Sequence, residues 1–135
     1  MKRDYKAAEA IVQYLFAFDV SGVCEKELIA VITQQLEIPK QKATELFSQA
    51  VAIWQSHDEL DKEISARSAD YDFTRIGFVE KGILRYALFA LQDNEANSTL
   101  VFKEAMRVAR KFSNPRSAKY INAVLDAKNS SLSSQ

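Results

Sequence analysis

The chain has 135 residues, and its 18 acidic side chains balance 18 basic ones, so its formal net charge is zero. That length predicts a single domain that buries roughly two thirds of its unfolded surface. A composition with 47% hydrophobic residues, three glycines and two prolines favours helices over a turn-rich sheet protein. No apolar run reaches the length of a membrane span and no secretory signal is recognisable, so we expect a cytoplasmic protein with no membrane partner.

In the first half of the chain, apolar residues recur at helical spacing. We predict three helices there, over about residues 4–20, 24–36 and 41–66. Ser21 and Gly22 end the first of these, and Pro39 stops the second. The sequence DYDFT at 70–74 is the main break, and it divides the chain into two helical halves of about 4–67 and 75–128.

The second half is predicted to hold three further helices, over about residues 76–92, 98–113 and 115–128. The Asn97-Ser98-Thr99 triplet is suited to cap the second of these helices. Ser113 or Asn114 is suited to cap the third, and Pro115 suits its first helical position. The expected core of this half is apolar and consists of Ile83, Leu84, Ala87, Val108, Phe112, Ile121 and Leu125. The sequence therefore predicts an all-α domain over 1–128, made of two small packed helical bundles with about six helices. The segment 129–135 has little apolar content and is predicted to be disordered.

Cysteine and histidine usage argues against catalytic and metal-binding arrangements. Cys24 is the only cysteine, so it forms neither an internal disulfide nor a cysteine-based zinc site. His57, the only histidine, falls on an apolar helical stripe, which favours a hydrogen-bonded structural role. The sequence shows no glycine-rich phosphate loop and no nucleophile beside a histidine in a recognised arrangement. We therefore predict a binding protein, not an enzyme, with no cofactor and no metal.

Charge is distributed unevenly along the chain. Residues 98–128 carry seven Lys/Arg against two Asp/Glu, whereas residues 1–97 carry eleven against sixteen. The basic end therefore predicts a surface for a polyanion. Within it, Arg116, Lys119 and Tyr120 gather at the start of the last helix, and cations beside an aromatic ring suit a phosphate backbone with a stacked, unpaired base. The alternative interpretation of this cluster is a solvated helix face.

Three blocks of this sequence resemble the NusB transcription antitermination family. They are RIGFVEKGILRYAL at 75–88, KEAMRVARKFS at 103–113 and SAKYINAVLD at 117–126, in the family's order and at nearly its spacing. The segment AAEAIVQYLFAFDVSG at 7–22 is similar more loosely. The resemblance implies a NusB-like helical fold. It also implies a factor that binds boxA-type RNA of nascent ribosomal RNA transcripts together with NusE, a small-subunit ribosomal protein, and acts on the RNA polymerase elongation complex.

The resemblance also implies an RNA-binding face, which combines a basic N-terminal segment, the last helix and nearby basic positions. The corresponding residues here are Lys2, Arg3, Lys6, Gln13, Arg107, Arg110, Arg116, Lys119 and Tyr120. The N-terminal cations are fewer than the arginines that the family often carries there, which predicts weaker boxA binding. Arg116 stands where many relatives have an acidic residue. Ala90 stands where the family usually has a glutamate that contacts NusE, and Ala90 and Arg116 are the predicted partner-binding positions.

Two other functions are compatible with the same residues. One is a stand-alone RNA-binding relative without boxA specificity, similar to the NusB-like domain attached to ribosomal RNA cytosine methyltransferases. The other is a helical protein-interaction module that has lost RNA binding. The cluster of cations over 103–119 favours RNA over a purely protein surface. The oligomeric state is not predicted by the sequence.

Overall fold

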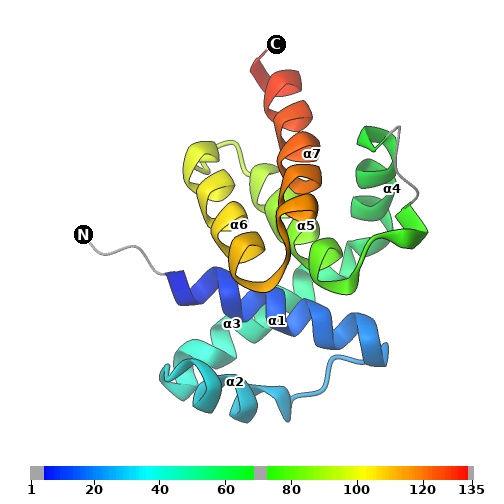
Figure 1. Ribbon diagram of the computed structural model, residues 1–135. Helices are drawn as coiled ribbons and strands as arrows, with labels where there is room; N and C mark the ends of the chain where they lie inside the picture. Colours follow the sequence, from blue (N-terminus) through cyan, green and yellow to red (C-terminus); the bar gives the residue numbers. More distant parts are fainter. Residues whose placement is uncertain (1–4, 69–72, 134–135) are drawn as a thin grey trace.

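The computed structural model describes residues 5–68 and 73–133, and the regular secondary structure in these ranges is all helical, without a strand (Figure 1). The α-helices are α1 (Tyr5–Ser21), α2 (Leu28–Leu36), α3 (Lys40–Gln55), α4 (His57–Arg67), α5 (Phe78–Leu91), α6 (Ser98–Phe112) and α7 (Pro115–Ser133), and a short 3-10 helix covers Phe73–Arg75. The prediction of an all-α fold is confirmed, with seven α-helices in the described part of the chain where about six were expected.

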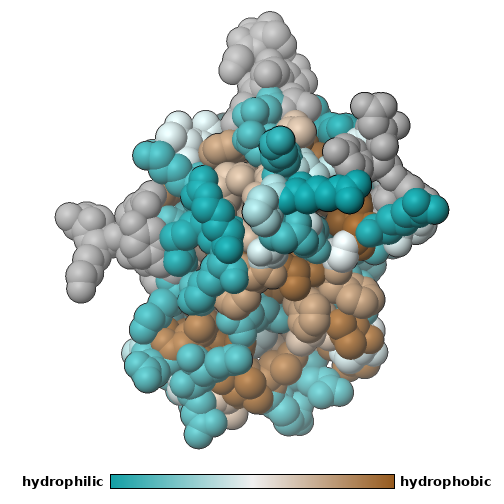
Figure 2. All heavy atoms as spheres, in the orientation of Figure 1, coloured by the Kyte–Doolittle hydropathy of each residue, from teal (hydrophilic) through white to brown (hydrophobic). Residues whose placement is uncertain are grey.

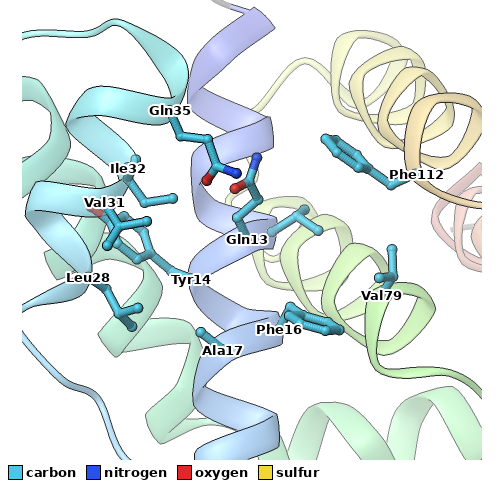
Figure 3. Close-up of a pocket in the computed structure, with 11 residues that line it drawn as sticks. Gln13, Tyr14, Phe16, Ala17, Leu28, Val31, Ile32, Gln35, Val79 and Phe112 are labelled. Atoms are coloured by element: carbon cyan, nitrogen blue, oxygen red, sulfur yellow. The ribbon is translucent and has the colours of Figure 1, made fainter.

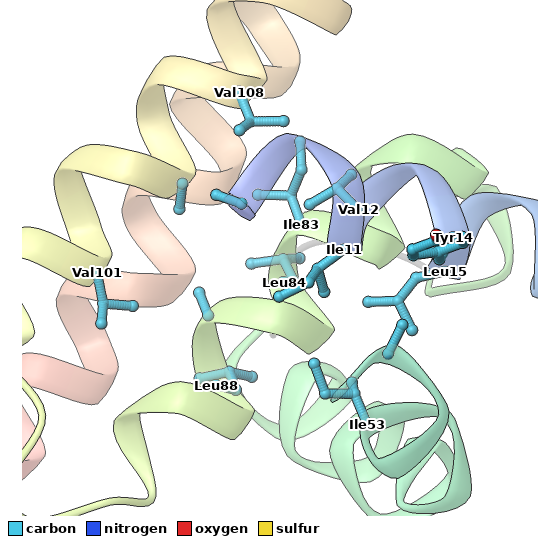
Figure 4. Packing of buried hydrophobic residues seen from close by; sticks show 14 of the residues in the cluster. Ile11, Val12, Tyr14, Leu15, Ile53, Ile83, Leu84, Leu88, Val101 and Val108 are labelled. Carbon is cyan, nitrogen blue, oxygen red and sulfur yellow. The ribbon is translucent and has the colours of Figure 1, made fainter. Parts of the chain in front are cut away.

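Helix α1 lies at the centre of the fold. It crosses the middle of the molecule, with α2 and α3 on one side and α5 and α6 on the other (Figure 1). Its buried residues Ile11 and Leu15 lie between Ile53 of α3 and Leu84 of α5, within one continuous hydrophobic cluster (Figure 4). The helix ends at Gly22, whose φ of 77° is a left-handed conformation that favours glycine. One helix therefore supplies core contacts to both halves of the chain.

A buried ion cluster joins α1, α4 and α5. Arg85 is buried, with 2% of the residue exposed. Its Nε and Nη2 each donate a 2.8 Å hydrogen bond to Asp61. Its Nη1 donates to Asp19 at 2.9 Å, and the Trp54 ring lies 5.4 Å from the guanidinium carbon. Burial by itself disfavours the charged form, but hydrogen bonds and charge attraction from Asp61 and Asp19 hold the pKa of Arg85 above its ordinary value.

Three helix boundaries differ from the sequence predictions. The single helix expected over 41–66 is two helices, because α3 ends at Gln55 and the Ser56 N–H turns back to the Ile53 carbonyl at 3.0 Å. Helix α2 begins at Leu28, not near residue 24. Helix α7 continues to Ser133, so the backbone is helical through most of the segment 129–135, where disorder was expected.

His57 has the structural role that its position predicted. Its Nδ1 lies 2.5 Å from the Trp54 carbonyl oxygen, and the two rings stack with centroids 4.0 Å apart. The side chain is half-buried at the start of α4. The contacts therefore hold the break between α3 and α4 in place.

In the described part of the chain, no helix has both the length and the apolar character needed to cross a membrane.

Candidate nucleic-acid interface

The connection between α6 and α7 is built by local capping. Asn97 starts α6 by accepting a 3.1 Å hydrogen bond from the Leu100 N–H. Asn114 starts α7 by accepting one of 2.9 Å from the Ser117 N–H, and Pro115 is the first residue of that helix. Ser113 Oγ donates to Glu80 Oε2 at 2.5 Å, which fastens the connection to α5. The predicted caps are confirmed, and of the two candidates for α7 it is Asn114, not Ser113, that caps the helix.

A groove of about 480 Å³ lies between the end of α6 and the start of α7. We call it the α6–α7 groove, and it is lined by Met106, Arg110, Ser113, Asn114, Pro115, Ala118, Lys119 and Asn122. Arg110 and Lys119 are exposed on its borders, and the exposed Arg116 follows Pro115. The described structure contains no ion pair of these three cations. The groove thus combines uncompensated positive charge with the Asn114 and Asn122 amides, a combination that suits a phosphate backbone.

Arg107 lies outside this groove, in a second charge cluster. Its Nη2 is 3.4 Å from Oε1 of the buried Glu9, and its Nε is 3.9 Å from Glu104 Oε2. Lys111 Nζ donates a 2.9 Å hydrogen bond to the same Glu9 oxygen. Arg107 is therefore half-buried, with its side chain 30% exposed, and it pairs with acidic residues instead of lining the groove. Helical spacing could not show this, because Glu9 comes from α1, nearly a hundred positions earlier in the chain.

Tyr120 belongs to the core and not to the exposed face. Tyr120 is only 6% exposed, and its hydroxyl oxygen lies 2.7 Å from Ser68 Oγ. Because Ser68 Oγ donates to the Ile64 carbonyl at 2.6 Å, the Tyr120 hydroxyl is the donor between the two. Tyr120 precedes Val124 by one turn, and both fall on a buried stripe that is wider than the sequence suggested. The prediction that its ring is available to stack on a base is wrong.

The other predicted site residues are spread over the surface. Lys6 is exposed in the first turn of α1, and Lys2 and Arg3 lie outside the described residues. Ala90 is half-buried and lines a recess of about 320 Å³ between α5, α1 and α3, together with Ile11, Ile53 and Phe89. Arg116 does not line that recess, so the two predicted partner-binding positions do not share one cavity.

Sequence reasoning missed a second hollow, which we call the α1 trough. It has a volume of about 330 Å³ and is lined by Val12, Gln13, Tyr14, Phe16, Ala17, Leu28, Val31, Ile32, Gln35, Val79 and Phe112 (Figure 3). Phe112, predicted to lie in the core, is 40% exposed on this trough. Helical spacing gave the correct side of α6, but Phe112 is the last residue of the helix. The neighbouring helices in the described part of the chain leave the ring partly exposed there.

The two hollows lie on a surface of mixed character. Hydrophilic side chains gather over the upper part of the face in Figure 2, where α6 and α7 lie, and apolar side chains gather below them over α1 and α2. In the described residues, no cluster of three or more acidic, cysteine or histidine side chains could hold a metal ion.

Solved structures with the same fold identify the class of protein. A chain from a crystal structure described as a plectonemic RNA supercoil superposes with a TM-score of 0.83 over 98% of this chain and 97% of its own, at 21% identity. NusB of T. maritima superposes with a TM-score of 0.74 over 94% of this chain and 91% of its own, at 19% identity. The fold is that of the NusB proteins.

Sequence comparison then identifies the family. Residues 5–129 match the NusB family model. The transcription antitermination protein NusB of Wolinella succinogenes is 30% identical over 125 residues, which are 90% of each chain. That of Sulfurimonas denitrificans is 28% identical over 127 residues, which are 94% of this chain and 96% of its own. The chain therefore belongs to the NusB family, and the resemblance of its sequence blocks is confirmed. It is an antitermination factor by family, not an enzyme.

Proposed function

We propose that the protein binds boxA-type RNA of nascent ribosomal RNA transcripts together with NusE, and that the pair acts on the RNA polymerase elongation complex in the cytoplasm. One observation carries the proposal. In a chain of the NusB family, the exposed Arg110 and Lys119 line one groove, the exposed Arg116 follows its lining residue Pro115, and the three form no ion pair within the described residues.

The groove suits single-stranded RNA on physical grounds. Each cation that neutralises a phosphate releases a counterion, and for single strands this contributes about 0.7 to the slope of log affinity against log salt. Arg110 and Lys119 line the groove, so both are within reach of one strand. The Asn114 side chain is used in capping α7, whereas the Asn122 amide remains beside the cations to contact a base. Lys6, Arg107 and the N-terminal Lys2 and Arg3 are secondary members of the proposed face.

The proposed contact with NusE involves the recess at Ala90. Because an alanine replaces the glutamate that the family usually carries, the recess is lined there by Ala90 and Phe89, and Asp93 is the acidic residue that lines it. Arg116 is the second proposed partner position. A partner that shares the RNA with this protein would compensate for the few N-terminal cations, since linked surfaces strengthen each other's binding.

The test is a fluorescence anisotropy titration of a short boxA-like RNA at two salt concentrations. The variant Arg110→Ala/Lys119→Ala should bind more weakly, with a log–log salt slope reduced by about 1.4, which corresponds to two lost phosphate contacts. The control Lys26→Ala/Lys62→Ala removes the same charge from exposed positions on α4 and before α2, far from the groove in sequence. Equal affinities and slopes for the two double variants would contradict the proposal.

A second candidate function is RNA binding without boxA specificity. The cations of the α6–α7 groove favour it, because Arg110 and Lys119 can contact phosphates without reading the base sequence. The same titration with a scrambled RNA separates the two functions. Equal affinity for the boxA-like and scrambled strands would favour the second.

A further inference from the structure

We propose that Glu9 limits the affinity of this protein for RNA, because its carboxylate competes with RNA phosphates for Lys111 and Arg107. The inference rests on the proposed RNA-binding function and names a residue that sets its strength. Three features of the structure support it: the burial of the carboxylate, the direction of the two basic side chains, and the balance of charge around them.

Glu9 is a buried acidic residue on α1. It is 4% exposed, and its neighbours Ala8 and Ala10 are 1% and 0% exposed. A buried carboxylate is costly unless it is paired, so its partners must reach it inside the protein. Lys111 Nζ donates a 2.9 Å hydrogen bond to Glu9 Oε1, and Arg107 Nη2 lies 3.4 Å from the same oxygen. One carboxylate oxygen of α1 therefore binds two cations of α6.

The charges around Glu9 cancel. Arg107 Nε lies 3.9 Å from Oε2 of Glu104, which is also buried, so two carboxylates accompany two cations. We call Glu9, Glu104, Arg107 and Lys111 the Glu9 cluster. Lys111 still reaches the surface, because its side chain is 53% exposed. A phosphate that approaches from solvent therefore meets an ammonium group that Glu9 already binds.

The Glu9 cluster lies close to the cations of the α6–α7 groove. Arg110 of the groove follows Arg107 by three positions and precedes Lys111 by one, so all three lie within one turn of α6. One turn of an α-helix is about 5.4 Å long, less than the Debye length of about 8 Å at physiological salt. The Glu9 charge therefore also weakens the attraction of the groove itself for phosphate.

The competing role for Glu9 is to position the two cations for RNA. In that role the guanidinium of Arg107 would face solvent, yet its side chain is only 30% exposed and two of its nitrogens lie near carboxylate oxygens. The geometry favours competition, since the pairing reduces the positive charge that a phosphate meets. The two roles predict opposite effects on RNA binding when the carboxylate is removed.

The first measurement is a fluorescence anisotropy titration of Glu9→Gln with a short boxA-like RNA at two salt concentrations. Glutamine keeps the size of the side chain and an oxygen acceptor but removes the charge, so Lys111 becomes available to a phosphate. One added phosphate contact should steepen the log–log salt slope by about 0.7, which corresponds to about fivefold tighter binding at about 0.1 M salt. The control Glu59→Gln removes the same charge from an exposed position on α4, and it should leave affinity and slope nearly unchanged.

Lys111 variants test the competition independently of how stable Glu9→Gln is. In the native protein Lys111→Ala should weaken RNA binding by less than about twofold, because its ammonium is already paired, whereas Arg110→Ala should weaken it by about fivefold. In the Glu9→Gln background, Lys111→Ala should remove the gain in affinity. Thermal unfolding of each variant shows that the titrated protein is folded.

Three results would overturn the inference. Equal affinities for Glu9→Gln and Glu59→Gln would show that the Glu9 charge does not affect RNA binding. Weaker binding by a folded Glu9→Gln would show that Glu9 positions the cations. A loss for Lys111→Ala in the native protein as large as that for Arg110→Ala would show that Lys111 already contacts RNA.

The same titrations with a scrambled RNA separate this inference from the proposed boxA function. Phosphate contacts do not depend on base sequence, so Glu9→Gln should bind both strands more tightly than the native protein does. If the boxA function fails, the native protein will bind the two strands equally, and Glu9→Gln will still show the gain on both.

Discussion

At the level of single residues, Tyr120 has a structural role in the core, where the family resemblance implied a role in RNA binding. Its hydroxyl bonds to Ser68 Oγ, which in turn bonds to the Ile64 carbonyl, so the ring ties α7 to the end of α4. The neighbouring Lys119 points outward on the α6–α7 groove. The pair Lys119-Tyr120 therefore combines one surface residue with one residue of the core.

Tyr120 variants should change stability. Tyr120→Phe loses one buried hydrogen bond and should lower the free energy of unfolding by about 0.5–1.5 kcal/mol. Tyr120→Ala also leaves a cavity and should cost about 3–5 kcal/mol. Urea unfolding measures both, with Lys119→Ala as the adjacent surface control. If Tyr120→Ala were as stable as Lys119→Ala, the ring would not belong to the core.

Tyr14 predicts how stability depends on alkaline pH. Its hydroxyl donates to the Ala43 carbonyl at 2.9 Å, and burial raises the pKa of Tyr14 from 10.0 to about 12. Because the folded-state pKa lies above the unfolded one, the stabilisation is complete below pH 10 and falls as the pH rises to about 12. Tyr86 contributes in the same window, since burial first and the Glu104 charge second raise its pKa to about 12.

The measurement is the free energy of unfolding between neutral pH and about pH 12. Tyr14→Phe should be less stable than the native protein at neutral pH, and its stability should fall less steeply above pH 10 because only Tyr86 of this pair remains. Parallel alkaline curves for Tyr14→Phe and the native protein would contradict this account.

At the level of elements, α6 has two basic sides with different functions. Arg107 and Lys111 face Glu9 of α1, and they hold the two helices together. Arg110 faces the groove and has no such partner in the described structure. The positive charge that the sequence predicted for this helix is thus divided between packing and binding.

This division predicts that two charge reversals have different effects, one on stability and the other on RNA binding. Arg107→Glu places an acid beside Glu9 and Glu104, so it should lower the free energy of unfolding by about 1–3 kcal/mol. Arg116→Glu lies on the exposed start of α7 and should change stability by no more than about 0.5 kcal/mol, while weakening RNA binding. Thermal unfolding and RNA titration of both variants check this. A stable Arg107→Glu protein would show that the pair with Glu9 is dispensable.

The helix boundaries could be predicted where they depend on residues that are close in sequence. Asn97 and the Asn114-Pro115 pair marked the starts of α6 and α7 because caps depend on residues within one turn. The break at Ser56 had no proline or glycine to announce it, and apolar spacing continues from Ile53 to Leu60 across it. It depends on the turn of the Ser56 N–H and on the stacking of His57 on Trp54.

Positions that depend on neighbouring elements could not be predicted in the same way. Spacing along α6 gives the direction of Phe112 but not the length of the helices beside it, and so it could not distinguish core from surface. The exposed cations of the α6–α7 groove could be predicted, because Arg110 and Lys119 fall on the polar sides of their helices. The pairing of Arg107 could not, because Glu9 lies in the first helix.

At the level of the whole molecule, Arg85 connects the two halves of the chain. It lies in α5 and binds Asp19 of α1 and Asp61 of α4 in a buried site beside Trp54. The hydrophobic cluster crosses the same boundary through α1. Hydrogen bonds are directional and apolar contacts are not. The charge cluster therefore fixes the relative orientation of α1, α4 and α5 more specifically than apolar packing alone would.

Removal of this arginine should destabilise the whole domain. Arg85→Met leaves two carboxylates without their cation and should lower the free energy of unfolding by about 3 kcal/mol, the low end for a buried pair because Asp19 and Asp61 are partly exposed. The control Arg67→Met breaks the half-buried i,i+4 pair with Glu63 within α4 and should cost about 0.5 kcal/mol. Urea denaturation measures the free energy of unfolding of both variants. Equal losses would show that the buried Arg85 cluster stabilises the fold no more than the Arg67–Glu63 pair does.

The most direct test of boxA recognition is an anisotropy titration of the native protein and NusE, together and separately, against a boxA-like RNA and a scrambled RNA of the same composition. We predict that the protein alone binds weakly and that NusE strengthens binding of the boxA-like strand, because the two proteins share one RNA. With NusE present, the boxA-like strand should bind more tightly than the scrambled one by at least about tenfold, within the range that one well-placed base contact supplies. Equal affinities for the two strands, with and without NusE, would contradict the account.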